Sequence, residues 1–158
     1  GSTGLVSVTF DPARDELFVA RAGGGAWLRR GTDAPKRLLV TRTDALARSL
    51  LATGFAYDRS TAARNNLSEF NRMIHRVRGI RRAGSAGLDM AWVAAGRLDG
   101  YWEYHLSPWD WSAGALLVRE AGGVVRTVDG RDWAPGDDSL VCAGSTLVDS
   151  LQAALVEP

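Results

Sequence analysis

The sequence predicts a layered fold of the α/β or α+β class. Short segments rich in β-branched and aromatic residues are interspersed with segments of helical spacing, and glycines mark many of the boundaries. The order of these segments lacks a strict strand–helix–strand rhythm, which is typical of mixed layers. Hydrophobic residues make up 46% of the 158 residues and charged residues 23%, a balance that supports a compact core.

Residues 1–43 predict an antiparallel β-meander and one following strand. The first two strands are joined at 11–15, where Pro12 fixes one backbone angle and Asp11 can bond its own backbone. The expected strands are 5–10, 16–20, a third beginning at 26–28, and 37–41. The glycines at 23–25 separate the second strand from the third. No Gly-Lys-Ser/Thr and no helical pattern follows them, so a hairpin turn is favoured over a phosphate-binding loop.

Residues 44–158 predict a mixed α/β subdomain. The clearest helix is 110–121, because its apolar residues recur at helical spacing and Gly122-Gly123 follows. The other expected helices are 44–50, 60–73, 84–95 ending at Gly96, and 146–156. The expected strands are 99–103, 124–127 and 140–143.

Charge and cysteine content limit the function classes. The net charge of +1 argues against a general nucleic-acid binder, whose affinity rests on a strong positive field. No uninterrupted apolar segment is long enough to cross a bilayer, so no membrane partner is expected. The single cysteine, Cys142, lies in an apolar stretch and is expected to be a buried strand residue. One cysteine cannot form an internal disulfide, which fits a cytoplasmic location.

The basic and histidine residues carry weaker signals. The cluster from Arg72 to Arg82 can attract a phosphorylated substrate or form a solvated face, and the solvated face is favoured. His75 and His105 are too few for a zinc site without clustered cysteines. His105 lies close in sequence to Glu103 and Asp110, so a position at the rim of a site is open to it.

Asp110 is a candidate metal ligand at a helix start. The free N–H groups and the dipole of a helix N-terminus stabilise a charged carboxylate, which is the ligand type that Mg²⁺ prefers. Asp is also among the commonest N-caps, so the position alone favours capping.

The neighbouring motifs weaken the interpretation of Asp110 as a cap alone. Trp109-Asp110, Ala113 to Val118 and Glu120 to Gly123 together resemble the C-terminal signature of the inositol monophosphatase family. Further matching segments are Gly84 to Ala91, Val93 to Glu103, Phe10-Asp11-Pro12 with Asp15 to Phe18, Gly23 to Ala26, and, more weakly, Thr53-Gly54-Phe55. The resemblance covers nearly the whole of 1–158, in the family order, and identifies the chain as the C-terminal portion of such a protein. At Ser112 the family usually has Ala or Cys, which are also small.

The resemblance implies a layered α+β sandwich, with mixed sheets and helices packed between and outside them. It also implies a phosphomonoesterase that uses two or three Mg²⁺ ions to assist attack of water on a phosphate ester. Asp110 matches a metal ligand, Glu103 a position that binds substrate hydroxyls, and Gly84, Ser85 and Ala86 positions at a helix start that face the sugar ring. Without the resemblance, Glu103 is better explained as a solvated edge-strand carboxylate and Ser85 as an N-cap.

The other metal ligands of the family lie in an upstream Glu and an Asp-Pro-x-Asp-Gly-Thr segment, and this sequence has neither. One carboxylate cannot hold two or three Mg²⁺ ions, so the chain alone is expected to be inactive. A small phosphorylated polyol or sugar is the expected substrate. Two alternatives stay open: a non-catalytic relative kept for binding or subunit assembly, and the same chemistry on histidinol phosphate, fructose bisphosphate or a nucleotide phosphate. Association is also expected, as a homo-oligomer or with the missing half, because half a layered fold exposes apolar surface.

Overall fold

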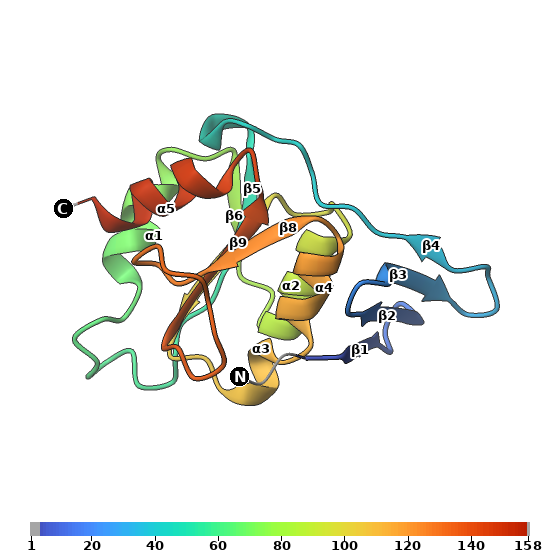
Figure 1. Ribbon diagram of the computed structural model, residues 1–158. Helices are drawn as coiled ribbons and strands as arrows, with labels where there is room; N and C mark the ends of the chain where they lie inside the picture. The colour runs from blue at the N-terminus through green and yellow to red at the C-terminus, as the bar shows by residue number, and fades with distance from the viewer. Residues whose placement is uncertain (1–3, 158) are drawn as a thin grey trace.

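The protein, seen in a computed structural model that describes residues 4–157, consists of four layers (Figure 1). Residues 1–3 and 158, which belong to the C-terminal portion predicted for 1–158, lie outside the described residues. An antiparallel sheet forms the first layer, helices α2 (Ala86–Ala94) and α4 (Gly114–Glu120) the second, a mixed sheet the third, and helices α1 (Leu67–Ile74) and α5 (Val148–Val156) the fourth. The predicted layered sandwich, with helices between and outside the sheets, is confirmed. The predicted boundary between 43 and 44 stays a prediction.

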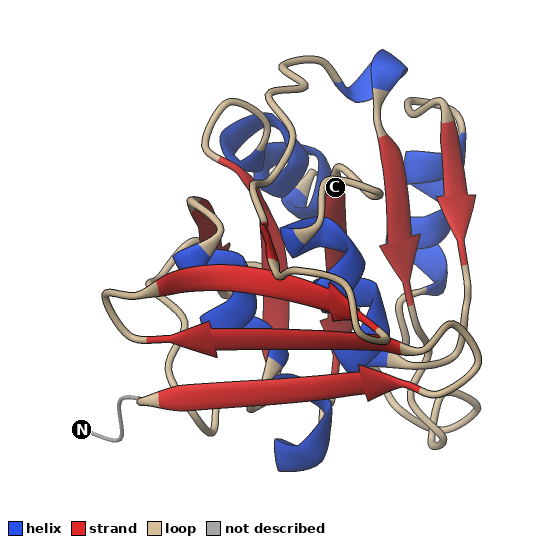
Figure 2. Cartoon of the chain, turned by 90° about the vertical axis from the view of Figure 1, so that its right-hand side faces the viewer, coloured by secondary structure: helices blue, strands red, loops and turns tan. Residues whose placement is uncertain are grey.

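The first sheet is the predicted meander. Its strands are β1 (Val6–Asp11), β2 (Glu16–Arg21), β3 (Gly25–Arg30) and β4 (Lys36–Arg37), in that order. Figure 2 shows the first three crossing in front of the strands behind them. The predicted strand 37–41 is wrong beyond Arg37: the chain leaves β3 there and runs toward the end of α4, where the Val40 N–H donates to the Ala121 carbonyl at 3.1 Å.

The second sheet mixes parallel and antiparallel pairs. It contains β5 (Leu50–Thr53), β6 (Gly79–Arg81), β7 (Gly100–Tyr104), β8 (Gly123–Arg126) and β9 (Ser139–Gly144), in the order β6-β5-β7-β9-β8. Strand β5 is parallel to both β6 and β7, whereas β9 is antiparallel to β7 and β8. Cys142 is fully buried in β9, as predicted.

The two middle helices pack on both sheets, and together with strand residues they form the larger core. Phe18 of β2, Met90 of α2, Leu117 of α4 and Tyr101 of β7 all belong to this one buried cluster. The predicted helix 110–121 is divided into α3 (Pro108–Trp111) and α4, with two turn residues between them. The helix begins earlier than predicted because Pro108, whose fixed backbone angle suits a first helical position, starts it.

Two other predicted helices are wrong in part. The segment 44–50 forms only a 3₁₀ turn, Leu46–Arg48, and then enters β5. Helix α1 begins at Leu67 rather than near residue 60, because Asn66 has a φ of 68°, in the left-handed region that a helix cannot pass through. Strands β5 and β6 were not predicted. No helix within the described residues is long and apolar enough to span a membrane.

Candidate functional site

A cleft lies at the edge of the mixed sheet where its three parallel strands end. The carboxyl ends of β5, β6 and β7 point the same way, so the segments that follow them meet at this edge. The cleft has a volume of about 210 Å³. Its lining comprises Thr53 to Tyr57, Arg82, Gly84 to Ala86, Asp89, Glu103, His105 to Ser107, Trp109 and Asp110. All five residues predicted for the site, Gly84, Ser85, Ala86, Glu103 and Asp110, therefore line one cleft.

The start of α2 forms one wall. Ser85 is the N-cap of this helix, and its hydroxyl accepts the Leu88 N–H at 3.4 Å. Gly84 has a φ of +93°, which an L side chain rarely adopts, and it turns the chain from β6 into the helix. Ser85 is thus an N-cap and also a residue of the cleft. The free N–H groups of the first helical turn are available to a bound anion or hydroxyl.

Asp110 lies in α3, which packs against α2. Its Oδ2 accepts the backbone N–H of Ser107 at 3.0 Å, which fixes the carboxylate at the start of the helix. Its Oδ1 accepts no hydrogen bond within residues 4–157. Asp110 therefore caps its own helix with one oxygen and leaves the other available in the cleft.

Glu103 projects into the cleft from the end of β7. The Tyr101 hydroxyl, two residues earlier on the same face of the strand, donates a hydrogen bond to it. Partial burial raises the pKa of Glu103, and the negative charge of Asp110 raises it further, while the Tyr101 hydrogen bond and the guanidinium of Arg82 act in the opposite direction. Glu103 is therefore not a solvated edge-strand carboxylate. It is a half-buried hydrogen-bonding group held at a fixed place.

Two charged residues of the cleft were missed from the sequence. Arg82 follows β6, is exposed and lines the cleft, so it is placed to attract a phosphorylated substrate, the alternative considered for the arginine cluster. Elsewhere in the cluster, Arg72 donates to the Leu155 carbonyl at 2.8 Å and Arg76 pairs with Glu157 at 2.5 Å. Asp89, the second missed residue, is 2% exposed on α2. An acid in the otherwise apolar helix 86–94 was the signal that could have found it.

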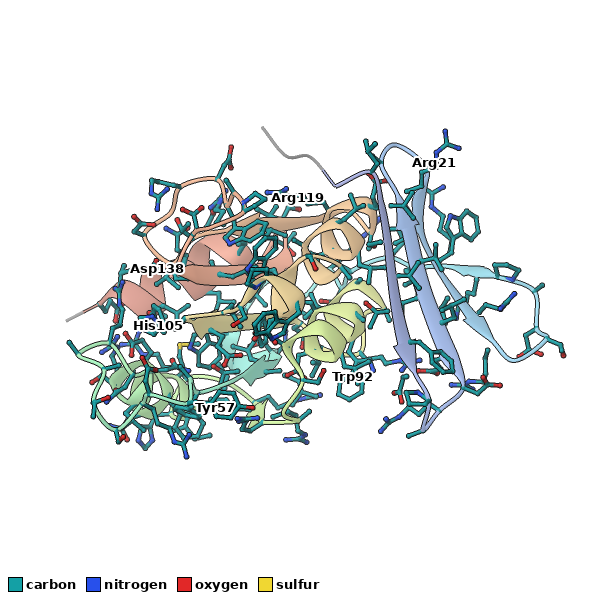
Figure 3. All side chains as sticks on the ribbon, turned by 90° about the horizontal axis from the view of Figure 1, so that it is seen from below. Arg21, Tyr57, Trp92, His105, Arg119 and Asp138 are labelled. Atoms are coloured by element: carbon teal, nitrogen blue, oxygen red, sulfur yellow. The ribbon has the colours of Figure 1, made fainter. Side chains whose placement is uncertain are left out.

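The mouth of the cleft carries aromatic and imidazole groups. Tyr57 and Trp109, 103% and 79% exposed, lie at its rim. His105 has a φ of 56°, and its Nε2 lies 3.0 Å from the Arg64 carbonyl oxygen. The structure places His105 at the rim of the cleft, the position considered for it from the sequence. Figure 3 shows His105 at the same end of the molecule as Tyr57, far from Arg21 in the hairpin.

The chemistry of the donors suits a hard cation at Asp110. The acidic side chains that line the cleft are all carboxylic acids, whose oxygens are the ligand atoms that Mg²⁺ prefers. Asp110 has one oxygen without a hydrogen-bond partner in the described chain. Among residues 4–157, no three His, Cys, Asp or Glu side chains gather into a cluster that can hold a metal ion. The residues present thus fit one ligand of a magnesium site.

Known proteins share both the sequence pattern and the architecture. The inositol monophosphatase family pattern matches residues 2–157. An inositol-1-monophosphatase from Synechocystis sp. is 48% identical over 124 residues, which are 78% of this chain and 42% of that protein. The Nus factor SuhB of Escherichia coli is 43% identical over 125 residues, 79% of this chain and 45% of its own length.

A solved structure gives the same result. The inositol monophosphatase from Anabaena (Nostoc) sp. superposes with a TM-score of 0.89 and 44% identity, covering 96% of this chain and 58% of that one. The chain spans about half the length of these relatives, between 42% and 58%. Because the sequence and the architecture both match, the chain belongs to the inositol monophosphatase family.

Proposed function

We propose that this chain supplies the substrate-recognition part of a magnesium-dependent phosphomonoesterase acting on inositol phosphate or a related sugar phosphate. The observation that carries the proposal is the meeting of Glu103, the start of α2 and Asp110 in one cleft. Each feature suits a different part of such a substrate. No residue of the cleft favours histidinol phosphate, fructose bisphosphate or a nucleotide phosphate over a polyol phosphate as the substrate.

Recognition of the polyol rests on Glu103 and the start of α2. A carboxylate accepts hydrogen bonds from hydroxyl groups, and the Tyr101 hydroxyl holds Glu103 in place to do so. The N–H groups at the start of α2 donate to hydroxyl or phosphate oxygens, and Arg82 adds a positive charge in the same cleft. These groups orient the substrate and leave its phosphate near Asp110.

Asp110 is the residue that would hold a Mg²⁺ ion in this chain. When bound, the ion neutralises negative charge on the phosphate oxygens. Mg²⁺ is commonly held by one or two carboxylates together with the substrate phosphate, so Asp110 and a phosphate ester suffice for one weakly held ion. Hydrolysis by two or three ions needs further carboxylates, and we propose that this chain alone does not catalyse it.

The binding step tests the function without relying on turnover. Titration of the chain with inositol monophosphate, followed by calorimetry or by amide chemical shifts, is carried out with and without Mg²⁺. Mg²⁺ is expected to tighten binding to the wild type and to have no effect on Asp110→Asn. Asp33→Asn, in the exposed turn before β4, is the matched control and is expected to behave like the wild type. A magnesium effect that survives in Asp110→Asn contradicts the assignment.

A second candidate function is subunit assembly, and the edge strand β1 favours it. Val6, Val8 and Phe10 alternate on one face of β1 and are 64%, 57% and 53% exposed. Strand β1 is also the edge of its sheet, so its outer backbone groups are open to a further strand. We propose that the chain associates through β1 with a second copy of itself.

Sedimentation velocity tests this association. The wild type is expected to sediment as an oligomer, and Val8→Lys as a monomer, because a charge on an apolar edge strand opposes pairing. Leu39→Lys, an equally exposed apolar residue outside both sheets, serves as the control and is expected to leave association intact. A wild-type chain that stays monomeric as its concentration rises contradicts the proposal.

A further inference from the structure

Asp89 differs from every other buried carboxyl group in the described chain. It is 2% exposed, its Oδ1 is completely shielded, and neither oxygen takes part in a hydrogen bond within residues 4–157. The other buried acids are all paired. Glu16 binds Arg97, Asp99 binds Thr43 and the Leu50 N–H, Asp11 binds Arg14, and Glu69 binds Tyr104.

An unpartnered buried carboxyl group is costly, which calls for an explanation outside the fold itself. Burial of a polar group without a hydrogen bond costs free energy, because the group loses its hydrogen bonds to water. The other buried acids have hydrogen-bond partners within the described chain, so the lack of a partner at Asp89 is an exception. Asp89, by contrast, lines the cleft next to the start of α2. Because of this position, a bound ligand can supply the hydrogen-bond partner that Asp89 lacks.

The groups facing Asp89 favour a neutral hydrogen-bonding carboxyl. Burial raises its pKa to about 7, and the negative charge of Glu103 contributes to the rise, while Arg82 opposes it. Tyr101 and Cys142 also interact with Asp89, and Asp110 interacts with Glu103. A carboxyl group that carries its proton can donate as well as accept a hydrogen bond, whereas a carboxylate can only accept. The two acids therefore complement each other.

We infer that Asp89 is a specificity-determining residue that acts with Glu103 to take two neighbouring hydroxyl groups of a polyol phosphate. This inference deepens the proposed function and rests on it. A hydroxyl group both donates and accepts, so a vicinal diol can satisfy an acceptor at Glu103 and a donor or acceptor at Asp89. A phosphate ester without hydroxyl groups leaves Asp89 unpaired and gives Glu103 no partner besides Tyr101, and it is rejected for that reason.

A matched pair of ligands separates this role from a merely structural one. Inositol monophosphate and cyclohexyl phosphate share a six-membered ring and a phosphate but differ in their hydroxyl groups. Dissociation constants for both are measured by amide chemical shifts on this chain, with a chelator present so that no divalent cation contributes. The proteins are the wild type, Asp89→Leu, which removes the polar group, and Asp89→Asn, which keeps a donor and an acceptor.

The wild type is expected to prefer inositol monophosphate, and Asp89→Leu to reduce that preference about tenfold without changing the affinity for cyclohexyl phosphate. Asp89→Asn is expected to retain most of the preference. Thermal unfolding is expected to show Asp89→Leu at least as stable as the wild type, because an unpaired buried carboxyl is removed. A preference unchanged in Asp89→Leu overturns the role of Asp89 and leaves the proposed function standing. A wild-type chain that binds both esters equally overturns both.

Discussion

Gly54 lies directly against the carboxylate of Glu103. A Cβ atom built on Gly54 would overlap both carboxylate oxygens of Glu103, so no other residue fits there without displacing the acid. The backbone of Gly54 is not in the left-handed region, and space rather than conformation therefore requires glycine. This contact joins the end of β5 to the end of β7 at the centre of the cleft.

Gly54→Ala is expected to weaken binding of inositol monophosphate about tenfold or more, because Glu103 must turn away from its place beside Tyr101. Calorimetry with the purified variant measures the change. Gly87→Ala is the matched control: it lies in α2, where a Cβ would meet the Asp110 carbonyl oxygen at an ordinary 3.7 Å. Equal binding by Gly54→Ala and the wild type contradicts the placement of Glu103 in recognition.

Asn66 fixes the end of β5 from the other side. Its side chain donates to the Thr53 hydroxyl at 2.8 Å and to the Gly54 carbonyl at 2.7 Å, and it accepts the Trp102 indole N–H at 2.6 Å. Asn66→Gly keeps the left-handed backbone but leaves these buried partners unpaired. We expect it to lower the free energy of unfolding by about 1–3 kcal/mol, as measured by urea denaturation. A loss below a few tenths of a kcal/mol would show that water or a neighbour replaces the amide.

Glu16 links the first sheet to the end of α2 and makes stability depend on acid. Its carboxylate accepts two hydrogen bonds from Arg97, at 2.6 and 2.8 Å, and also pairs with Arg30. The bond from Arg97 is the main cause that lowers the pKa of Glu16 from 4.5 to about 2, against the effect of burial. Because the folded-state pKa is the lower one, this stabilisation is complete above pH 4.5 and is lost as the pH falls toward 2.

Chemical denaturation between pH 7 and pH 3 measures that loss. On the order of 2 kcal/mol is expected to depend on Glu16, and in Glu16→Gln this component of the slope is expected to vanish. Identical slopes for the two proteins over that range are incompatible with a tightly held carboxylate.

Glu120 explains the three consecutive glycines of the hairpin. Its two carboxylate oxygens accept the N–H groups of Gly23 and Gly25, each at 2.8 Å. Gly23 and Gly25 both have positive φ values, 70° and 80°, so the turn presents its backbone to the end of α4. Glu120→Gln is expected to cost about 1–2 kcal/mol of stability, since one charge-assisted bond is lost and the other weakened. Thermal unfolding measures it, and an unchanged midpoint contradicts the role of this contact.

Local signals in the sequence were sufficient for much of the fold. The meander, α2 with its Ser85 cap and Gly96 stop, and the buried Cys142 all follow from short patterns whose cause lies within a few residues. The five predicted cleft residues came from motif resemblance rather than from periodicity. Their meeting in one place follows from the parallel pairing of β5 with β7.

The missed features depend on contacts that are distant in sequence. Strand β5 is a short apolar run buried between two parallel neighbours, so it lacks the alternation that marks a half-exposed strand. Arg82 lies in an arginine-rich run, and only the pairing of β6 with β5 brings it into the cleft. The left-handed conformation of Asn66 is set by its three buried hydrogen bonds, which no local pattern displays.

We propose that this chain recognises a polyol phosphate but lacks the ligands for hydrolysis. The most direct test is release of inorganic phosphate from inositol monophosphate by the purified chain in the presence of Mg²⁺, with Asp110→Asn measured in parallel. We expect no release above that of Asp110→Asn. Magnesium-dependent release that disappears in Asp110→Asn would contradict it, because Asp110 would then belong to a complete catalytic site within these 158 residues.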